Sequence, residues 1–160
     1  MTFTSIDFET ATGKRNSACA VGLITVENGQ IIDEYSTLIK PPNNEYNWHN
    51  TNVHGITAYD TRNSPTFDNV YDEIKNRLAG RTVVAHNASF DRSVLQKTMV
   101  EFGLDYSELN ITWECTLKIY REKGYSPAKL DNCCQIHNIP LNHHDALSDA
   151  KACAQLFLIR

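Results

Sequence analysis

The sequence predicts an α/β protein in which helices flank a mixed five-stranded sheet. Two β-rich runs, residues 19–27 and 30–39, are joined by Asn28-Gly29 and are expected to form an antiparallel hairpin. A short apolar run at residues 82–85 is followed by a helical pattern, as in a buried strand of an α/β protein. These observations indicate a sheet in which one strand runs antiparallel to the others.

The first third of the chain consists mainly of predicted strands. Residues 3–9 form a short apolar-rich run that ends in acidic residues, and the hairpin follows it. Asn-Gly supplies the two positive-φ positions of a type I′ turn, which gives a tight connection. Pro41-Pro42 ends the third strand, and we expect the polar segment 43–63 to be irregular with a short helical turn.

Helices dominate the rest of the chain. One helix is expected from Pro65 to the vicinity of Gly80, because apolar residues recur at spacings of three and four: Phe67, Val70, Ile74 and Leu78. Ser89 is a candidate N-cap for a helix over 90–102 that Gly103 closes. The remaining pattern predicts a fifth strand at 111–113, short helices near 116–122 and 128–137, and a last helix over 145–158.

Length and composition indicate one ordinary globular domain over residues 1–160. Hydrophobic residues make up 41% and charged residues 21%, which argues against disorder or a fibre. No apolar run reaches the roughly 18 residues of a membrane span, and no secretory leader is recognisable. The five cysteines are odd in number and lack a Cys-x-x-Cys spacing, so we expect no disulfide framework and a cytoplasmic location.

The net charge of −4 excludes a protein that grips duplex phosphates through a broad basic surface. It is compatible with a nucleic-acid enzyme whose local anionic site is neutralised by metal ions. Tyr46 and Trp48 are candidates for base stacking, because they precede His54 in the polar segment. Lys118, Arg121 and Lys123 are expected to form a solvated helix face, with steering of the nucleic-acid strand as the alternative.

Acidic residues mark the carboxyl end of the first strand. Side chains alternate along a strand, so Asp7 and Glu9 point to the same face, at an end of the sheet where ligands bind in open α/β folds. Asp91 opens the helix after the strand at 82–85, a position where an acid also complements the helix dipole. If that strand pairs beside the first strand, Asp91 comes close to Asp7 and Glu9.

A third acidic element is the segment His143-His144-Asp145-Ala146-Leu147-Ser148-Asp149. His144 and Asp149 are five residues apart, which is roughly 140° on a helix, so they cannot share one helix face. We therefore expect His144 on a loop before the last helix and Asp149 pointing inward from that helix. Asp145 is explained as an N-cap.

Four carboxylates in one crevice would repel one another. At about 5 Å and an effective dielectric constant near 20, each like pair costs about 3 kcal/mol. Hard oxygen ligands favour Mg²⁺ or Mn²⁺ over zinc, and two divalent ions would offset all four charges. Such a pair of ions suits in-line displacement at phosphorus, in which one ion activates water and the other stabilises the leaving oxygen.

Three segments resemble, in order, the exonuclease motifs of the DEDDh superfamily. They are Asp7-Phe8-Glu9-Thr10, His86-Asn87-Ala88-Ser89-Phe90-Asp91, and His144 with Asp149. Val53-His54-Gly55-Ile56-Thr57 and Cys115-Thr116-Leu117 are similar to its intervening landmarks. The superfamily includes the proofreading epsilon subunit of bacterial DNA polymerase III, exonuclease X and ribonuclease T. The resemblance covers nearly the whole chain and implies a ribonuclease H-like fold with 3′→5′ exonuclease activity.

The resemblance also implies a role for each matching residue. The ligands of two divalent ions, Mg²⁺ or Mn²⁺, would be Asp7, Glu9, Asp91 and Asp149. His144 would be the general base that deprotonates the attacking water, with His143 as the alternative base. Thr10, His54 and Asn87 are assigned to substrate binding, Asn87 by supporting the second motif.

The leading prediction is a nuclease that shortens single-stranded 3′ ends, with DNA favoured and with repair or proofreading as its setting. RNA trimming, as in ribonuclease T or oligoribonuclease, stays open because the scissile phosphate is the same. A catalytically silent nucleic-acid or protein-binding module is the third alternative, and it predicts a broken acidic set. Some family members form homodimers, which the sequence does not settle. Polymerase association is possible but is not supported by a visible polymerase-binding tail after Arg160.

Overall fold

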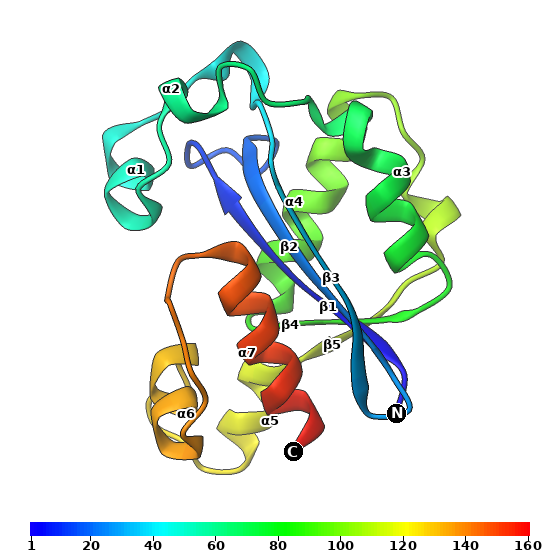
Figure 1. Cartoon of the computed structure of the whole chain (residues 1–160), viewed down its shortest axis with the longest axis vertical. Coiled ribbons are helices and arrows are strands. Elements are labelled where there is room, and N and C mark those ends of the chain that lie inside the picture. Colours follow the sequence, from blue (N-terminus) through cyan, green and yellow to red (C-terminus); the bar gives the residue numbers. More distant parts are fainter.

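A computed structural model describes residues 1–160, and its centre is a five-stranded sheet (Figure 1). The strand order is β3-β2-β1-β4-β5. The strands are β1 (Phe3–Thr10), β2 (Ala18–Glu27), β3 (Gln30–Leu38), β4 (Thr82–Ala85) and β5 (Thr112–Cys115). β2 is antiparallel to both β1 and β3, whereas β4 is parallel to both β1 and β5. The predicted mixed sheet with one antiparallel strand is therefore confirmed.

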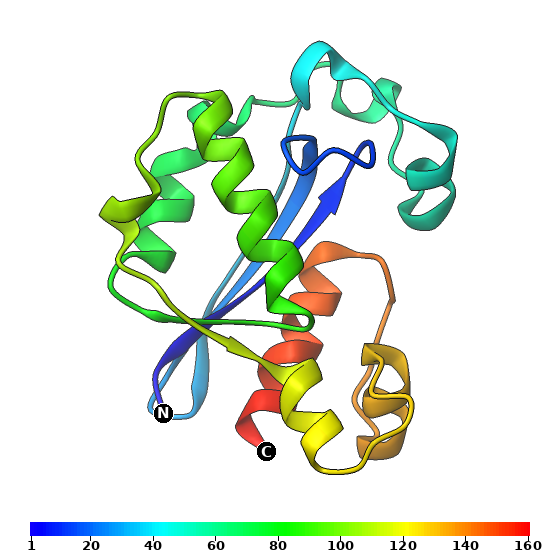
Figure 2. The same ribbon diagram turned by 180° about the vertical axis from the view of Figure 1, so that it is seen from behind.

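Helices cover both faces of the sheet (Figures 1 and 2). α3 (Phe67–Leu78) and α4 (Ala88–Glu101) lie on one face, and α7 (Ala146–Leu158) lies on the other, beside α5 (Thr116–Glu122) and α6 (Leu130–His137). Ile6 and Phe8 belong to the core under α3 and α4, while Phe3 packs against Phe157 of α7. By strand alternation, the odd-numbered side chains of β1 face the α7 side.

The turn between β2 and β3 follows its sequence signal. Asn28 has φ 51° and Gly29 has φ 79°, the two positive values that a type I′ turn requires. α3 likewise buries the apolar positions predicted for it, together with Tyr71.

Segment 43–63 is more helical than expected. It contains the end of the 3₁₀ turn η1 (Pro42–Asn44) and the short helices α1 (Trp48–His54) and α2 (Ala58–Thr61). The Asn47 side chain caps α1 by accepting the Asn50 N–H, and Thr57 forms a capping box with Asp60. Local caps of this kind stabilise helices too short to show an apolar period. These helices lie beyond the carboxyl end of β1 (Figure 1).

Other boundaries also differ from the predictions. Ser89 is not an N-cap: α4 begins at Ala88, and the N-cap position is Asn87, which has φ 81°. A 3₁₀ turn, η2 (Tyr106–Leu109), was not expected, and α6 begins at Leu130 rather than near residue 128. None of the helices is both long enough and apolar enough to cross a membrane.

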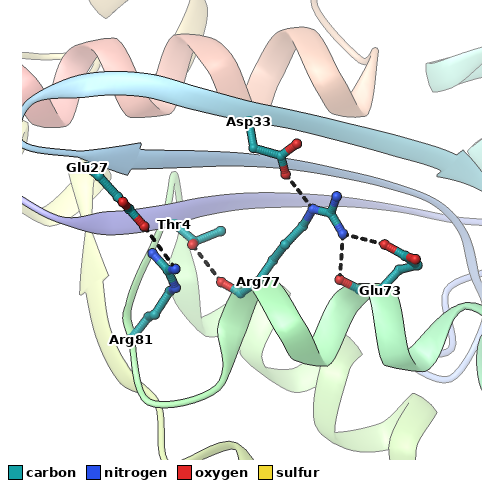
Figure 3. A network of polar contacts seen from close by, with 6 residues as sticks. All are labelled: Thr4, Glu27, Asp33, Glu73, Arg77 and Arg81. Atoms are coloured by element: carbon teal, nitrogen blue, oxygen red, sulfur yellow. Dashed lines mark hydrogen bonds and ion pairs between the residues drawn. The ribbon is translucent and has the colours of Figure 1, made fainter.

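A polar network fastens α3 to the end of the sheet opposite the acidic residues (Figure 3). Arg77 Nε lies 2.7 Å from Asp33 Oδ2 of β3, and its Nη1 lies 2.7 Å from Glu73 Oε2. The Thr4 hydroxyl donates to the Arg77 carbonyl at 2.7 Å. Arg81 pairs with Glu27 at 3.1 Å, which joins the entry to β4 to the end of β2. The network orients the sheet edge without contacting the site described below.

Candidate active site

β1 presents the first two carboxylates. Asp7 and Glu9 lie on the same face of the strand, and Glu9 is buried. In the register with β2, Asp7 is opposite Gly22 and Glu9 is opposite Ala20. Small partners on β2 leave room above the sheet, so both carboxylates face the first turn of α7.

α4 brings the third carboxylate to the same place. β4 pairs beside β1, and Asn87 turns the chain from β4 into the helix. Asp91, which is only 2% exposed, accepts the backbone N–H of Phe8 through Oδ1 at 3.0 Å. This bond joins Asp91 to the strand residue between Asp7 and Glu9.

The start of α7 supplies the fourth carboxylate. Asp145 caps the helix by accepting the Ser148 N–H, as predicted. The Ser5 hydroxyl donates to the Ala150 carbonyl at 2.6 Å, which fastens the helix to β1. Asp149 is buried, and single ligand atoms of Asp7, Glu9 and Asp149 lie within 4.8 Å of one another.

Burial raises the pKa of every member of this cluster, and repulsion from neighbouring carboxylates adds to the rise at Asp7, Glu9 and Asp91. Burial is the largest cause for each of the four carboxylates. The pKa of Glu9 rises to about 8 and that of Asp91 to about 7, while the pKa of Asp7 lies well above its usual value. The Phe8 N–H and Arg15 offset part of the shift at Asp91. The cluster therefore favours binding of protons or cations.

The donor set fits divalent cations better than protons alone. Oδ1 of Asp149 is buried and has no hydrogen-bond partner, although its carboxylate lies among other acids. An unpartnered buried carboxylate oxygen is costly unless something binds it. Carboxylate oxygens are the ligands that Mg²⁺ and Mn²⁺ prefer.

His144 lies on the loop immediately before α7, as predicted. Its φ is 67°, a left-handed value that is uncommon for a residue other than glycine. Its backbone N–H donates to Asp149 Oδ2 at 3.2 Å, which holds this conformation. Burial and the neighbouring His143 lower its pKa, so the imidazole is neutral at pH 7 and can accept a proton.

His143, the alternative base in the sequence analysis, lies against Asp149 and His144. Its Nδ1 lies 2.8 Å from Asp149 Oδ2, and its ring stacks on that of His144 with centroids 3.9 Å apart. His143 thus contacts both a carboxylate of the cluster and the candidate base.

The three residues assigned to substrate binding lie around the cluster in different environments. Ile56 N–H donates to Nδ1 of His54 at 3.0 Å, so Nε2 carries the proton and donates to the Thr10 carbonyl at 2.9 Å. Both ring nitrogens are therefore engaged, and only the ring face and edge of His54 are available to a ligand. Thr10 is buried, and its hydroxyl accepts from Asn50 at 3.1 Å. Asn87 is exposed, and its side chain accepts from Ser89.

His86 has a structural environment. Nε2 donates to the Ala128 carbonyl and Nδ1 accepts from the Thr116 hydroxyl, both at 2.9 Å. Burial lowers its pKa to about 4, so the ring is neutral, and it joins the end of β4 to the first residue of α5 and to the segment before α6. The guanidinium carbon of Arg15 lies over the Phe90 ring, 4.2 Å from the ring centroid.

We use the term acidic depression for the surface hollow of about 390 Å³ that opens beside the cluster. Its lining comprises Asp7, Phe8, Glu9, His86, Phe90, Leu117, Arg121, Lys129, Leu130, His143, His144 and Asp149. Arg121 and Lys129 make no ion pair. Arg121 is exposed, as expected for a solvated helix face, and its side chain also borders this depression. Only the packing of α5 and α6 beside α7 reveals this, and no spacing in the sequence signals it.

A second hollow of about 310 Å³ adjoins the first. His144 lines both hollows, and the second is also lined by His54, Ile56 and residues of β2, β3 and the start of α7. Of the two stacking candidates, Trp48 is 78% exposed on α1, whereas the Tyr46 hydroxyl is bonded to Thr61 at 2.9 Å.

Fold and site together define a hydrolase of the metal-dependent nuclease class. Asp7 and Glu9 of the central strand and Asp149 of α7 bring ligand atoms within 4.8 Å of one another beside a histidine, and Asp91 of α4 adjoins them through its bond to the Phe8 N–H. The chain belongs to the RNase_T exonuclease family, whose model matches residues 4–157. The resemblance seen in the sequence is thereby confirmed, and exonucleases of this family use divalent metal ions.

Curated relatives and solved structures agree with this family. The chain is 34% identical over 163 residues to DNA polymerase III PolC-type of Thermotoga petrophila, covering 98% of the chain and 12% of that protein. It is 28% identical to the 3′-5′ exonuclease DinG of Staphylococcus aureus, covering 99% of the chain and 18% of that protein. The structure of exonuclease X in complex with 5′ overhanging duplex DNA matches with a TM-score of 0.78 and 25% identity, covering 98% of this chain and 89% of that one. The chain thus spans less than a fifth of the length of these two curated relatives.

Proposed function

We propose that residues 1–160 form one exonuclease domain that hydrolyses the terminal phosphodiester bond at the 3′ end of single-stranded DNA, in the cytoplasm. The single observation that carries the proposal is the convergence of Asp7, Glu9, Asp91 and Asp149 beside His144. A silent binding module has no need of four clustered carboxylates, three of them buried, because burying a carboxylate is costly. Relatives named as DNA polymerase III and a neighbour in complex with DNA support DNA over RNA.

In this proposal the four carboxylates hold two divalent ions, Mg²⁺ or Mn²⁺. When bound, such ions supply activation of the attacking water and stabilisation of the leaving oxygen. The chain itself contributes fixed ligand positions. Asp91 is held by the Phe8 N–H, and Asp149 is held by bonds to its Oδ2. Rigid placement of the ligands lowers the reorganisation that the reaction needs.

His144 is the proposed general base. It is neutral at pH 7, exposed to solvent, and placed between the acidic depression and the second hollow. We place the terminal nucleoside in the second hollow against the ring of His54 and beside Thr10, whose positions are fixed by their mutual bond. Asn87 acts by shaping the turn that aims α4 and its Asp91. Exposed Trp48 is a stacking surface for the strand.

Arg121 and Lys129 are the proposed contacts to the backbone of the strand. They are the unpaired cations among the residues that line the acidic depression. A backbone phosphate of the strand that lies outside the metal site needs a positive partner on the protein. All residues used here come from one chain, and the homodimer that some family members form is compatible with this mechanism. Proofreading and repair are settings that such an activity would serve.

The proposal is tested with DNA and RNA oligonucleotides labelled at the 5′ end. With Mg²⁺ or Mn²⁺ we expect a ladder of products shortened from the 3′ end, faster on DNA, and none with EDTA or a blocked 3′ terminus. Asp7→Asn should abolish shortening, and His144→Ala should slow it by about 10²–10⁴-fold. Internal cleavage, or an unchanged rate in either variant, would overturn the proposal.

A further inference from the structure

The two oxygens of Asp149 have different surroundings. Oδ2 receives two hydrogen bonds, from His143 Nδ1 at 2.8 Å and from the backbone N–H of His144 at 3.2 Å. Oδ1 is buried and receives none. An ionised carboxylate can only accept hydrogen bonds, so Nδ1 of His143 is the nitrogen that carries the proton.

This asymmetry fixes the rotation of the carboxylate. With Oδ2 held from two directions, Oδ1 is the oxygen left for a ligand, and Asp149 offers a ligand atom within 4.8 Å of those of Asp7 and Glu9. A carboxylate held by one oxygen loses less conformational entropy when the other oxygen binds a cation. Because its side chain is 36% exposed, His143 is not required to fill the core.

His143 also contacts the candidate base. Its ring lies nearly parallel to that of His144, at an interplanar angle of 19° and a centroid distance of 3.9 Å. His144 is held at a left-handed φ on the exposed loop before α7. The same imidazole therefore fixes Asp149 through its edge and supports His144 through its face.

We propose that His143 is a positioning residue that orients Asp149 through its Nδ1–H, so that Oδ1 faces the cation site. The part of this inference that concerns cation binding stands independently of the proposed function, and only its effect on rate rests on that function. Two rival roles exist, because a ligand atom of His143 also lies within 4.8 Å of those of His144 and Asp149: His143 could itself be a base or a metal ligand.

Three variants separate these roles. His143→Asn keeps an N–H donor near the position of Nδ1 but cannot take up a proton as a base. His143→Phe keeps the stacked ring and removes the donor, and His143→Ala removes both. The affinity for Mn²⁺ is measured from the electron paramagnetic resonance signal of free Mn²⁺, which needs no substrate. Thermal melting in EDTA verifies that each variant is folded.

We expect His143→Asn to bind Mn²⁺ within about threefold of the unaltered protein, and His143→Phe and His143→Ala to bind it about 10–100-fold more weakly. Single-turnover cleavage of a 3′ end should follow the same order. Unchanged affinity in His143→Phe would overturn the inference, and so would a His143→Asn variant as impaired as His143→Ala. If the unaltered protein cleaves nothing yet shows the expected order of Mn²⁺ affinities, the proposed function fails while the positioning role stands.

Discussion

Gly22 of β2 lies directly under the first residue of α7, Ala146. A Cβ atom at Gly22 would lie 2.3 Å from the carbonyl oxygen of Ala146 and 2.6 Å from Cα of Leu147. Both neighbours are backbone, so no side-chain rotation can relieve the clash. The absence of a side chain at Gly22 therefore allows α7 to approach the sheet closely enough for Asp149 to reach the cluster.

We predict that Gly22→Ala loses about 2–3 kcal/mol of unfolding free energy, because helix and sheet must separate. Nuclease activity should fall with it, since α7 carries Asp149. Gly13→Ala is the matched control, because a Cβ there meets nothing within 4 Å. Urea denaturation measures the unfolding free energy of both variants. Equal stability of the two would contradict the prediction, because it would show that α7 can move away from the sheet without cost.

Arg121 and Lys129, the two cations of the acidic depression, should bind the phosphates of the strand through electrostatic attraction. Arg121→Ala and Lys129→Ala should each raise KM several-fold and reduce the slope of log KM against log salt concentration by roughly 0.7–0.9, the value for one phosphate contact. Lys118→Ala, on the same helix as Arg121 but outside the depression, should change neither. A salt slope that is unaltered in the first two variants would remove them from the strand path.

The carboxylates should also make stability depend on pH when metal is chelated. Glu9 and Asp91 have pKa values of about 8 and 7 in the folded chain, against about 4 when unfolded. The folded state then binds more protons than the unfolded state, so stability falls as pH rises. The lowered pKa values of His54, His86 and His144 act in the opposite sense, and this effect fades above about pH 6.5 as the histidines of the unfolded chain lose their protons too.

The carboxylates therefore dominate the pH dependence of stability between pH 6.5 and 8. In EDTA the melting temperature should decrease across this window, and Glu9→Gln should reduce the decrease. Mg²⁺ should raise the melting temperature more at pH 8 than at pH 6.5, since it replaces protons. A melting temperature in EDTA that is constant or rises between these pH values would contradict the shifted pKa values.

Arg77 provides a test of stability apart from catalysis. Its guanidinium is largely buried and bonded to Asp33 and Glu73, so Arg77→Ala should cost about 1–3 kcal/mol of unfolding free energy. The reaction rate of the folded enzyme should be unchanged, because the strand residues of the network (Figure 3) lie at the end of the sheet opposite Asp7 and Glu9. Lys75→Ala, which breaks the exposed pair with Glu108, should cost less than about 1 kcal/mol. A lower rate in folded Arg77→Ala would mean that this end of the sheet influences the site.

Much of the fold was predictable because local signals agree with tertiary structure. Asn28-Gly29 determines the hairpin on its own, and the period of Phe67 to Leu78 matches the buried face of α3. α1 and α2 were missed because their stability comes from caps rather than from an apolar period. Ser89 was misread as an N-cap because the turn at Asn87, in the left-handed region, starts the helix two residues earlier.

The candidate site was predictable to a similar degree. Two spacings predict the observed geometry. The first places Asp7 and Glu9 on one face of a strand, and the second places His144 on a loop before the helix that carries Asp149. The role of His143 depends on one ring nitrogen meeting one oxygen, which no spacing specifies. Arg121 and Lys129 reach the depression only through the packing of α5 and α6 beside α7, a long-range arrangement.

The most direct measurement is calorimetric titration of the chain with Mn²⁺ at pH 7.5, in buffers that differ in ionisation enthalpy. If the four carboxylates form one cation site, two ions should bind saturably with release of protons, because Glu9 and Asp91 have raised pKa values. Asp7→Asn should lose at least one of these ions. No saturable binding, or binding without proton release, would contradict a cluster that is held together by divalent cations.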